Sequence, residues 1–207
     1  MTPLNEVIIN KKTSINPIWI MRQAGRYLPE FREIRKNNPN FIELCLNEKL
    51  TKEITLQPIK RFNLDAAIIF SDILMIPYGL RQKVEFKKDF GPLLGKLDIT
   101  SMSKIDEIDF VEKVYPVYKA IKSVSLEMKM KNKNTIGFVG APWTLLVYMI
   151  NQQSPKKNIK KDFFKDEYLI NRILLIIEKF LKIHIKNQID NGADLIQIFD
   201  SWAGLLE

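Results

Sequence analysis

Four short runs of apolar, mostly β-branched and aromatic residues, separated by long stretches with helical periodicity, constrain the fold of this chain most. The runs are residues 17–21, 66–70, 135–139 and 195–199. Nearly every position in each run is apolar, which is typical of a strand buried on both faces. Helical patterns cover residues 29–36, 48–62, 106–130 and 166–191. Strands that alternate with helices predict an α/β fold with a parallel sheet.

Residues 84–99 break the alternation. Gly91-Pro92 and Gly95 interrupt any regular pattern there, so we expect a loop or a small hairpin.

The polar residues that follow the runs decide between two α/β architectures. Arg22, Asp72 and the pair Asp200-Ser201 come directly or almost directly after three of the runs. A (β/α)8 barrel gathers its active site from the carboxyl ends of several strands, whereas a dinucleotide fold needs a glycine-rich loop, and none follows these runs. The sequence therefore favours a TIM barrel, of which residues 1–207 supply roughly the first four βα units as one incomplete domain.

A formal net charge of +8 raises the question of an anionic partner. The lysines are scattered along the chain, as in Lys129, Lys131 and Lys133, and no aromatic residues interleave with them as a nucleic-acid platform would need. We expect no nucleic-acid partner. A solvated surface is the favoured interpretation, and a small polyanionic substrate is the second.

The apolar runs and the numbers of cysteine and histidine residues limit the cellular location and the kinds of chemistry that we expect. The apolar runs are too short to cross a bilayer and no secretory signal opens the chain, so we expect a cytoplasmic protein without a membrane partner. The lone Cys45 lies among apolar residues, and we expect it to be a buried thiol. His184 lies between two isoleucines, and we expect it to have a structural role. One Cys and one His give no metal-site spacing.

Residues 21–27, Met-Arg-Gln-Ala-Gly-Arg-Tyr, are the most unusual segment. Two arginines four residues apart flank small residues, and guanidinium groups bind carboxylates through two parallel hydrogen bonds. The segment is either a carboxylate cradle or a surface turn whose arginines pair with Glu30 or Glu33, and the residues alone leave both interpretations open.

Three further candidates follow the later runs. Asp72 could accept N–H donors and stabilise a cation, or could cap the following helix. Tyr148 lies about one and a half turns into a helix that begins near Pro142, where its hydroxyl points to the barrel mouth or packs. Ser201 lacks a neighbouring histidine and a nucleophile elbow, which argues against a hydrolase triad.

Four segments together resemble the uroporphyrinogen decarboxylases. Residues 19–30 are similar to the first signature of that family, and residues 137–145 to the second. Residues 69–74 and 197–204 also match, in the same order, and the resemblance runs from about Pro17 to the last residue.

This resemblance implies a TIM barrel, usually a homodimer, that decarboxylates the four acetate arms of uroporphyrinogen III to methyls without metal or organic cofactor, giving coproporphyrinogen III. It implies that Arg22, Gln23, Ala24, Gly25 and Arg26 contact the tetrapyrrole substrate. It assigns to Asp72 the hydrogen bonds from the pyrrole N–H groups, and so the catalytic role. Tyr148 and Ser201 match two further substrate contacts.

The chain departs from the family pattern after the fourth run. It ends at Glu207, so the family's substrate-binding histidine near the C-terminus has no counterpart, and His184 does not correspond to it. We therefore expect residues 1–207 alone to be inactive and prone to aggregate through unpaired strand edges. The alternatives are an inactive fragment of that enzyme and a related TIM-barrel methyltransferase that uses a corrinoid or folate.

Overall fold

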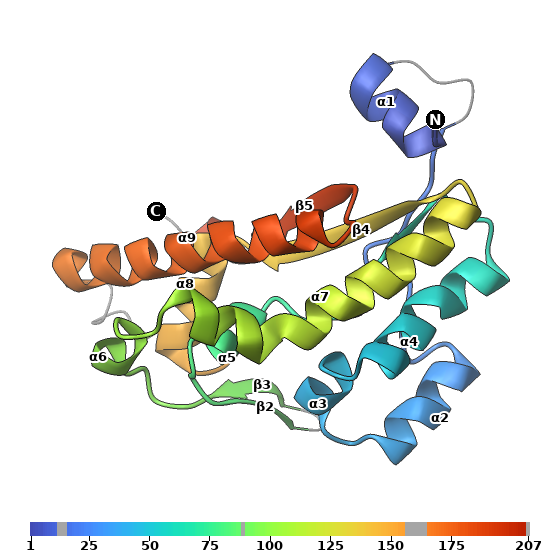
Figure 1. The fold of residues 1–207 in the computed structure, drawn as a ribbon. Coiled ribbons are helices and arrows are strands. Elements are labelled where there is room, and N and C mark those ends of the chain that lie inside the picture. The colour runs from blue at the N-terminus through green and yellow to red at the C-terminus, as the bar shows by residue number, and fades with distance from the viewer. Residues whose placement is uncertain (12–15, 88–89, 156–164, 206–207) are drawn as a thin grey trace. The chain divides into compact units, whose positions relative to one another are not determined.

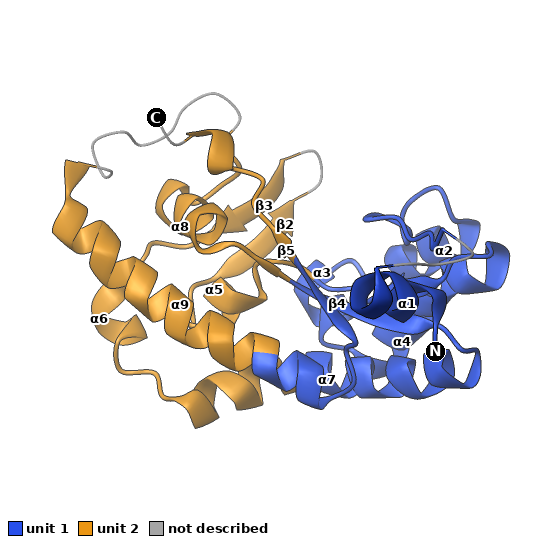
Figure 2. Ribbon diagram, turned by 90° about the horizontal axis from the view of Figure 1, so that it is seen from above, with its two compact units in different colours: residues 1–71, 116–138, 186–197 blue, residues 72–115, 139–185, 198–207 orange. Residues whose placement is uncertain are grey.

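The computed structural model of the chain describes residues 1–11, 16–87, 90–155 and 165–205. The chain divides into two compact units (Figure 2). Unit 1 contains residues 1–71, 116–138 and 186–197, and unit 2 contains residues 72–115, 139–185 and 198–207. Figure 1 labels the elements in chain order. Leu206 and Glu207, at the chain end, lie outside the described residues.

Three of the four apolar runs form one sheet with the order β1-β4-β5. The strands are β1 (Ala66–Ile68), β4 (Asn134–Gly140) and β5 (Leu195–Phe199). β1 and β4 are parallel, with Ala66 opposite Asn134 and Ile68 opposite Ile136. The Asp194 N–H donates to the Thr135 carbonyl at 2.8 Å near the start of β5, and the Ala141 N–H to the Phe199 carbonyl at 2.8 Å at its end. β5 therefore runs in the same direction as β4, which confirms the predicted parallel α/β sheet.

The first run, residues 17–21, forms no strand, so that prediction is wrong. Ile18, Ile20 and Met21 are 57%, 55% and 52% exposed, whereas a strand buried on both faces would hide them. The run still lies beside the start of β1: the Ile18 N–H donates to Asp65 Oδ2 at 2.7 Å, and the Asp65 N–H donates to the Ile18 carbonyl at 2.8 Å. A side chain supplies one of these two bonds, so the backbone ladder of a strand does not form.

The four predicted helices are present. They are α2 (Pro29–Asn37), α4 (Glu48–Arg61), α7 (Glu107–Met130) and α9 (Glu167–Asp190). α2 begins with proline and an acid and ends with basic residues, an arrangement that suits the helix dipole. The Asn47 side chain caps α4 by accepting from the Leu50 N–H at 3.1 Å. α9 stops before Gly192, whose φ of +103° needs a residue without a Cβ.

Shorter elements fill the connections. Residues 84–99 contain the expected hairpin, with β2 (Val84–Lys87) antiparallel to β3 (Gly91–Leu94); Lys88 and Asp89 lie outside the described residues. The helix expected to begin near Pro142 is α8 (Pro142–Asn151), with Pro142 in its first turn. The remaining helices are α1 (Pro3–Asn10), α3 (Phe41–Cys45), α5 (Met75–Gly79), α6 (Ile99–Met102) and the 3₁₀ helix η2 (Ala203–Leu205).

Each unit has its own apolar core. In unit 1, a cluster joins α2, α3 and α4 through Leu28, Phe31, Leu44 and Ile54, and Phe70 packs against it. Cys45 is completely buried in the same unit, as expected. In unit 2, the Phe110 ring lies 4.8 Å from Phe180 and 6.2 Å from His184, measured between centroids.

Burial follows the predicted pattern unevenly. Most residues of β4 are buried, but β5 is only half-buried and its Ile198 is 55% exposed, so the expectation of burial on both faces fails for β5.

Within the described residues, no helix combines the length and the apolar character needed to cross a membrane.

Candidate functional site

The arginine-rich segment, residues 21–27, forms a tight turn directly before α2 in unit 1. The Gln23 N–H donates to the Ile20 carbonyl at 3.1 Å, and the Leu28 N–H to the Gly25 carbonyl at 3.0 Å. The Tyr27 hydroxyl donates to the Gln23 carbonyl. Consecutive local hydrogen bonds of this kind hold the segment in one conformation. The two arginines therefore project from a fixed backbone.

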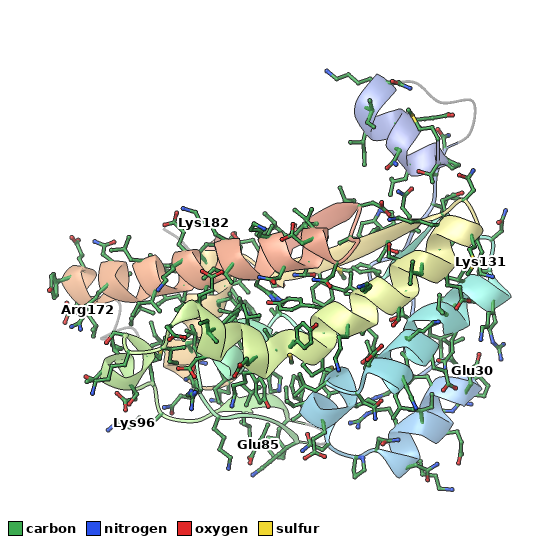
Figure 3. All side chains as sticks on the ribbon, in the orientation of Figure 1. Glu30, Glu85, Lys96, Lys131, Arg172 and Lys182 are labelled. Atoms are coloured by element: carbon green, nitrogen blue, oxygen red, sulfur yellow. The ribbon has the colours of Figure 1, made fainter. Side chains whose placement is uncertain are left out.

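Arg22 and Arg26 are both exposed, and neither forms an ion pair with any residue that the structure describes. The acids that the surface-turn interpretation assigned to them have other partners. Glu30, labelled in Figure 3, accepts two hydrogen bonds from Arg61 at 2.7 and 2.9 Å. Glu33 accepts from Asn37 at 3.2 Å. The arrangement leaves both guanidinium groups available to an external anion.

Arg35 is a half-buried basic residue in the last turn of α2. Burial lowers the pKa of its guanidinium first of all, and repulsion from Arg26 lowers it further. Arg35 also stacks over Phe41, with its guanidinium carbon 5.4 Å from the ring centroid. The fold therefore adds a third cation beside Arg26. The helix pattern of α2 did not indicate it, because α2 follows the turn and brings Arg35 back towards Arg26.

Gly25 is not required by the fold. Its φ lies outside the left-handed region, and a Cβ added there would meet only the Tyr27 ring at 3.8 Å, an ordinary contact. Ala24 packs against the unit 1 core. The missing side chain at Gly25 thus leaves open space beside the two arginines, as close approach of a ligand to the backbone would need.

Asp72 closes the loop after β1, at the start of unit 2. Its Oδ1 accepts from the Leu74 N–H at 2.8 Å, and its backbone carbonyl accepts from the Met75 N–H at 3.2 Å. This is an Asx turn before α5, whose N-cap is Leu74 and not Asp72. Among the described residues Oδ2 has no hydrogen-bond donor. Desolvation raises the pKa of Asp72 to about 6, and the Leu74 N–H partly offsets it.

Tyr148 and Ser201 lie next to a hydrogen-bonded cluster of Thr144, Asp200 and Trp202 in unit 2. Thr144, fully buried on α8, donates to Asp200 Oδ1 at 2.7 Å and accepts from the Trp202 N–H at 3.0 Å. Tyr148 is half-buried, and its ring centroid lies 5.9 Å from that of Trp202. Ser201 is exposed between the two residues that Thr144 holds.

The loop that carries Asp72 reaches the same end of the sheet as the start of α8. A Cβ added to Gly140, the last residue of β4, would lie 3.1 Å from Ile73 and 2.9 Å from Leu145. Glycine at this position therefore allows the loop after β1 to pack on the loop after β4.

Among the described residues, no group of three His, Cys, Asp or Glu side chains could hold a metal ion.

The fold and these residues define an α/β protein with polar turns after the carboxyl ends of its parallel strands. This arrangement is typical of α/β enzymes, whose active sites lie at that end of the sheet. The family model described as "Uroporphyrinogen decarboxylase (URO-D)" matches residues 1–207. The chain therefore belongs to the uroporphyrinogen decarboxylase family.

Curated relatives carry the same name. A uroporphyrinogen decarboxylase of Agrobacterium fabrum is 43% identical over 203 residues, which cover 96% of this chain and 58% of the relative. A uroporphyrinogen decarboxylase of Campylobacter jejuni is 41% identical over 206 residues, which cover 98% of this chain and 60% of the relative. The chain thus spans somewhat more than half the length of these relatives.

A solved structure shows the same fold. A methyltransferase from Methanosarcina mazei superposes with a TM-score of 0.69 at 14% identity, over 96% of this chain and 58% of that one. At this identity, the likeness concerns the fold alone.

Proposed function

We propose that this chain supplies the N-terminal part of the site of a uroporphyrinogen decarboxylase, which removes the four acetate carboxyls of uroporphyrinogen III as CO2 and gives coproporphyrinogen III. The observation that carries the proposal is the fixed turn that presents the guanidinium groups of Arg22 and Arg26 without an ion-pair partner among the described residues. Family membership supports the same reaction. Its substrate carries eight carboxylates, which guanidinium groups bind well.

In the proposed mechanism, the pyrrole ring acts as its own electron sink. Protonation of the ring carbon beside an acetate arm gives a cationic ring, which accepts the electron pair of the breaking C–C bond as CO2 leaves. The resulting exocyclic methylene is then protonated to a methyl, and loss of the proton that was first added to the ring carbon restores the neutral pyrrole.

Asp72 stabilises the cationic ring in this mechanism. Its Oδ2 has no donor among the described residues and can accept from pyrrole N–H groups, while Oδ1 is held by Leu74. With a pKa of about 6, the carboxyl is mostly ionised at pH 7. A fixed negative charge in a desolvated position stabilises a developing cation strongly. Tyr148 and Ser201 act as further substrate contacts.

The finer parts of the proposal rest on the family resemblance. They are a TIM barrel to which this chain contributes roughly four βα units, a homodimer, a cytoplasmic location and a reaction without metal or organic cofactor. The parallel sheet and the polar turns after its strands support the barrel.

Substrate binding tests the arginine turn. We expect Arg26→Lys to weaken binding of uroporphyrin, measured by fluorescence titration, by about tenfold, because a point ammonium cannot make the two-pronged contact. Arg172→Lys is the control, since Arg172 is exposed on α9 in unit 2 (Figure 3). Arg35 is unsuitable as a control because it lies near Arg26. Equal losses in both variants would show that general charge binds the porphyrin.

Turnover tests the role of Asp72. The assay measures coproporphyrinogen from a fusion of residues 1–207 to the region of the Agrobacterium fabrum relative that this chain does not cover. We expect Asp72→Ala to lower turnover on the order of a hundredfold or more, because the cationic ring loses its counter-charge. Near-native turnover in that variant would remove Asp72 from the mechanism. Residues 1–207 alone are expected to form no product.

A further inference from the structure

Gln23 lies between the two candidate arginines but points away from solvent. It is only 2% exposed, whereas Arg22 and Arg26 are exposed. Its Oε1 accepts from the Ile20 N–H at 3.2 Å, and its Nε2 donates to the Ala66 carbonyl at 3.1 Å. Both polar atoms of the side chain are thus bonded to backbone, and a substrate contact through the amide would require one of these bonds to break.

The two bonds of Gln23 join the arginine turn to the sheet. Ile20 belongs to the turn, and Ala66 is the first residue of β1. The backbone of Gln23 adds two more bonds within the turn, to the Ile20 carbonyl and from the Tyr27 hydroxyl. One buried side chain therefore fixes the turn both internally and against β1, where a regular strand at residues 17–21 would have used backbone bonds.

We propose that Gln23 is a positioning residue that places the guanidinium groups of Arg22 and Arg26 for a polycarboxylate, and does not itself bind the substrate. The inference rests on the proposed function and revises the direct contact that the family resemblance implied for Gln23. Two-pronged binding of a carboxylate depends on where the guanidinium is held, and a displacement of about 1 Å in a binding group can lower a rate or affinity by up to a hundredfold.

Gln188 provides a matched control in the same unit. It is 1% exposed; its Oε1 accepts from the Phe138 N–H at 3.0 Å, and its Nε2 donates to the Phe138 carbonyl at 3.1 Å. Gln188→Met and Gln23→Met therefore each remove two hydrogen bonds between a buried glutamine amide and the backbone. Only Gln23→Met removes them from the arginine turn.

Hydrogen exchange tests, without any substrate, whether the two side-chain hydrogen bonds of Gln23 hold the arginine turn. We expect Gln23→Met to speed backbone exchange in residues 18–27 by tenfold or more, on the order expected when a local hydrogen-bonded unit opens more easily. Gln188→Met should leave exchange in that segment unchanged. If Gln23→Met does not fold, Gln23→Asn serves instead, because its shorter amide keeps the polarity but cannot span both partners. Unchanged exchange in residues 18–27 would show that the amide does not hold the turn.

Uroporphyrin titration of the fusion used in the turnover assay tests the positioning. We expect Gln23→Met to weaken binding about tenfold. In a background that carries both Arg22→Lys and Arg26→Lys, the same change should add much less than tenfold, because the guanidinium groups that Gln23 positions are already gone. Equal losses in both backgrounds, or native affinity despite faster exchange, would overturn the proposal. If the unsubstituted fusion binds no uroporphyrin, the proposed function fails, and the exchange experiment alone decides whether Gln23 holds the turn.

Discussion

Burial shifts the pKa values of Asp72 and His184 in opposite directions. The pKa of Asp72 is raised from 3.8 to about 6, and that of His184 is lowered from 6.5 to about 4, in both cases chiefly by desolvation of the charged form. Between about pH 4 and 6, folded Asp72 holds a proton that the unfolded chain releases, so Asp72 makes stability fall as pH rises. Over nearly the same window the unfolded chain protonates His184 and the folded chain does not, so His184 makes stability rise.

We expect the two single variants to separate these opposing slopes. Asp72→Asn keeps the acceptor for the Leu74 N–H and removes the charge, so it should raise the free energy of unfolding near neutral pH by up to about 3 kcal/mol. Its stability should then increase with pH between about pH 4 and 6.5. His184→Gln should show the reverse, with stability decreasing as pH rises. Urea unfolding across this range measures both slopes, and parallel profiles for the two variants would contradict these burial effects.

At the scale of elements, single side chains hold several loops where backbone pairing is absent. Gln23 holds the arginine turn on β1, and Thr144 holds the loop after β5 on α8. Both residues are buried and use their donor and acceptor together. A donor and acceptor in one buried side chain can replace two ladder bonds at the end of a strand. The loops that carry the candidate residues are thereby fixed without lengthening the strands.

Thr144→Val tests the loop after β5. The variant keeps the shape of the side chain but leaves the Trp202 N–H without its acceptor, so we expect a loss of about 1–3 kcal/mol in the free energy of unfolding. Backbone exchange in residues 198–205 should also become faster. Thr51→Val is the control, because Thr51 is equally buried and donates to Leu44 and Cys45 in unit 1. Faster exchange at residues 198–205 in the control as well would indicate general loosening.

At the scale of the whole molecule, the sheet has unequal edges. β1 and β5 are its outer strands, and β4 lies between them. Residues 17–21 lie beside the start of β1 through the bonds of Ile18 and Asp65. β5, in contrast, has β4 as its single neighbouring strand among the described residues, and it carries the exposed Ile198. An apolar edge strand is a template for pairing with a second chain.

Ile198→Lys should therefore reduce self-association of residues 1–207, measured by light scattering at rising protein concentration. A lysine on an edge strand opposes edge-to-edge pairing. Leu175→Lys adds the same charge at a side chain that is 67% exposed on helix α9, which cannot add a strand to a sheet. The same reduction in both variants would mean that net charge, and not the β5 edge, controls association.

Hydrophobic periodicity and local motifs in the sequence alone determine most of the helices and strands of this protein. The helical patterns, the proline and glycine punctuation, and three of the four apolar runs predicted α2, α4, α7, α9 and the parallel strands, because these signals act within a few residues of the chain. The signature segments also indicated the family that the comparison then showed.

Only the tertiary structure decided which side chains meet. Residues 17–21 read as a buried strand, yet three of their apolar side chains are exposed and a glutamine amide replaces the ladder. Arg35 of α2 lies near Arg26, and Glu30 pairs with Arg61, 31 positions away. These contacts join residues from separate elements, and hydrophobic periodicity carries no information on such partners.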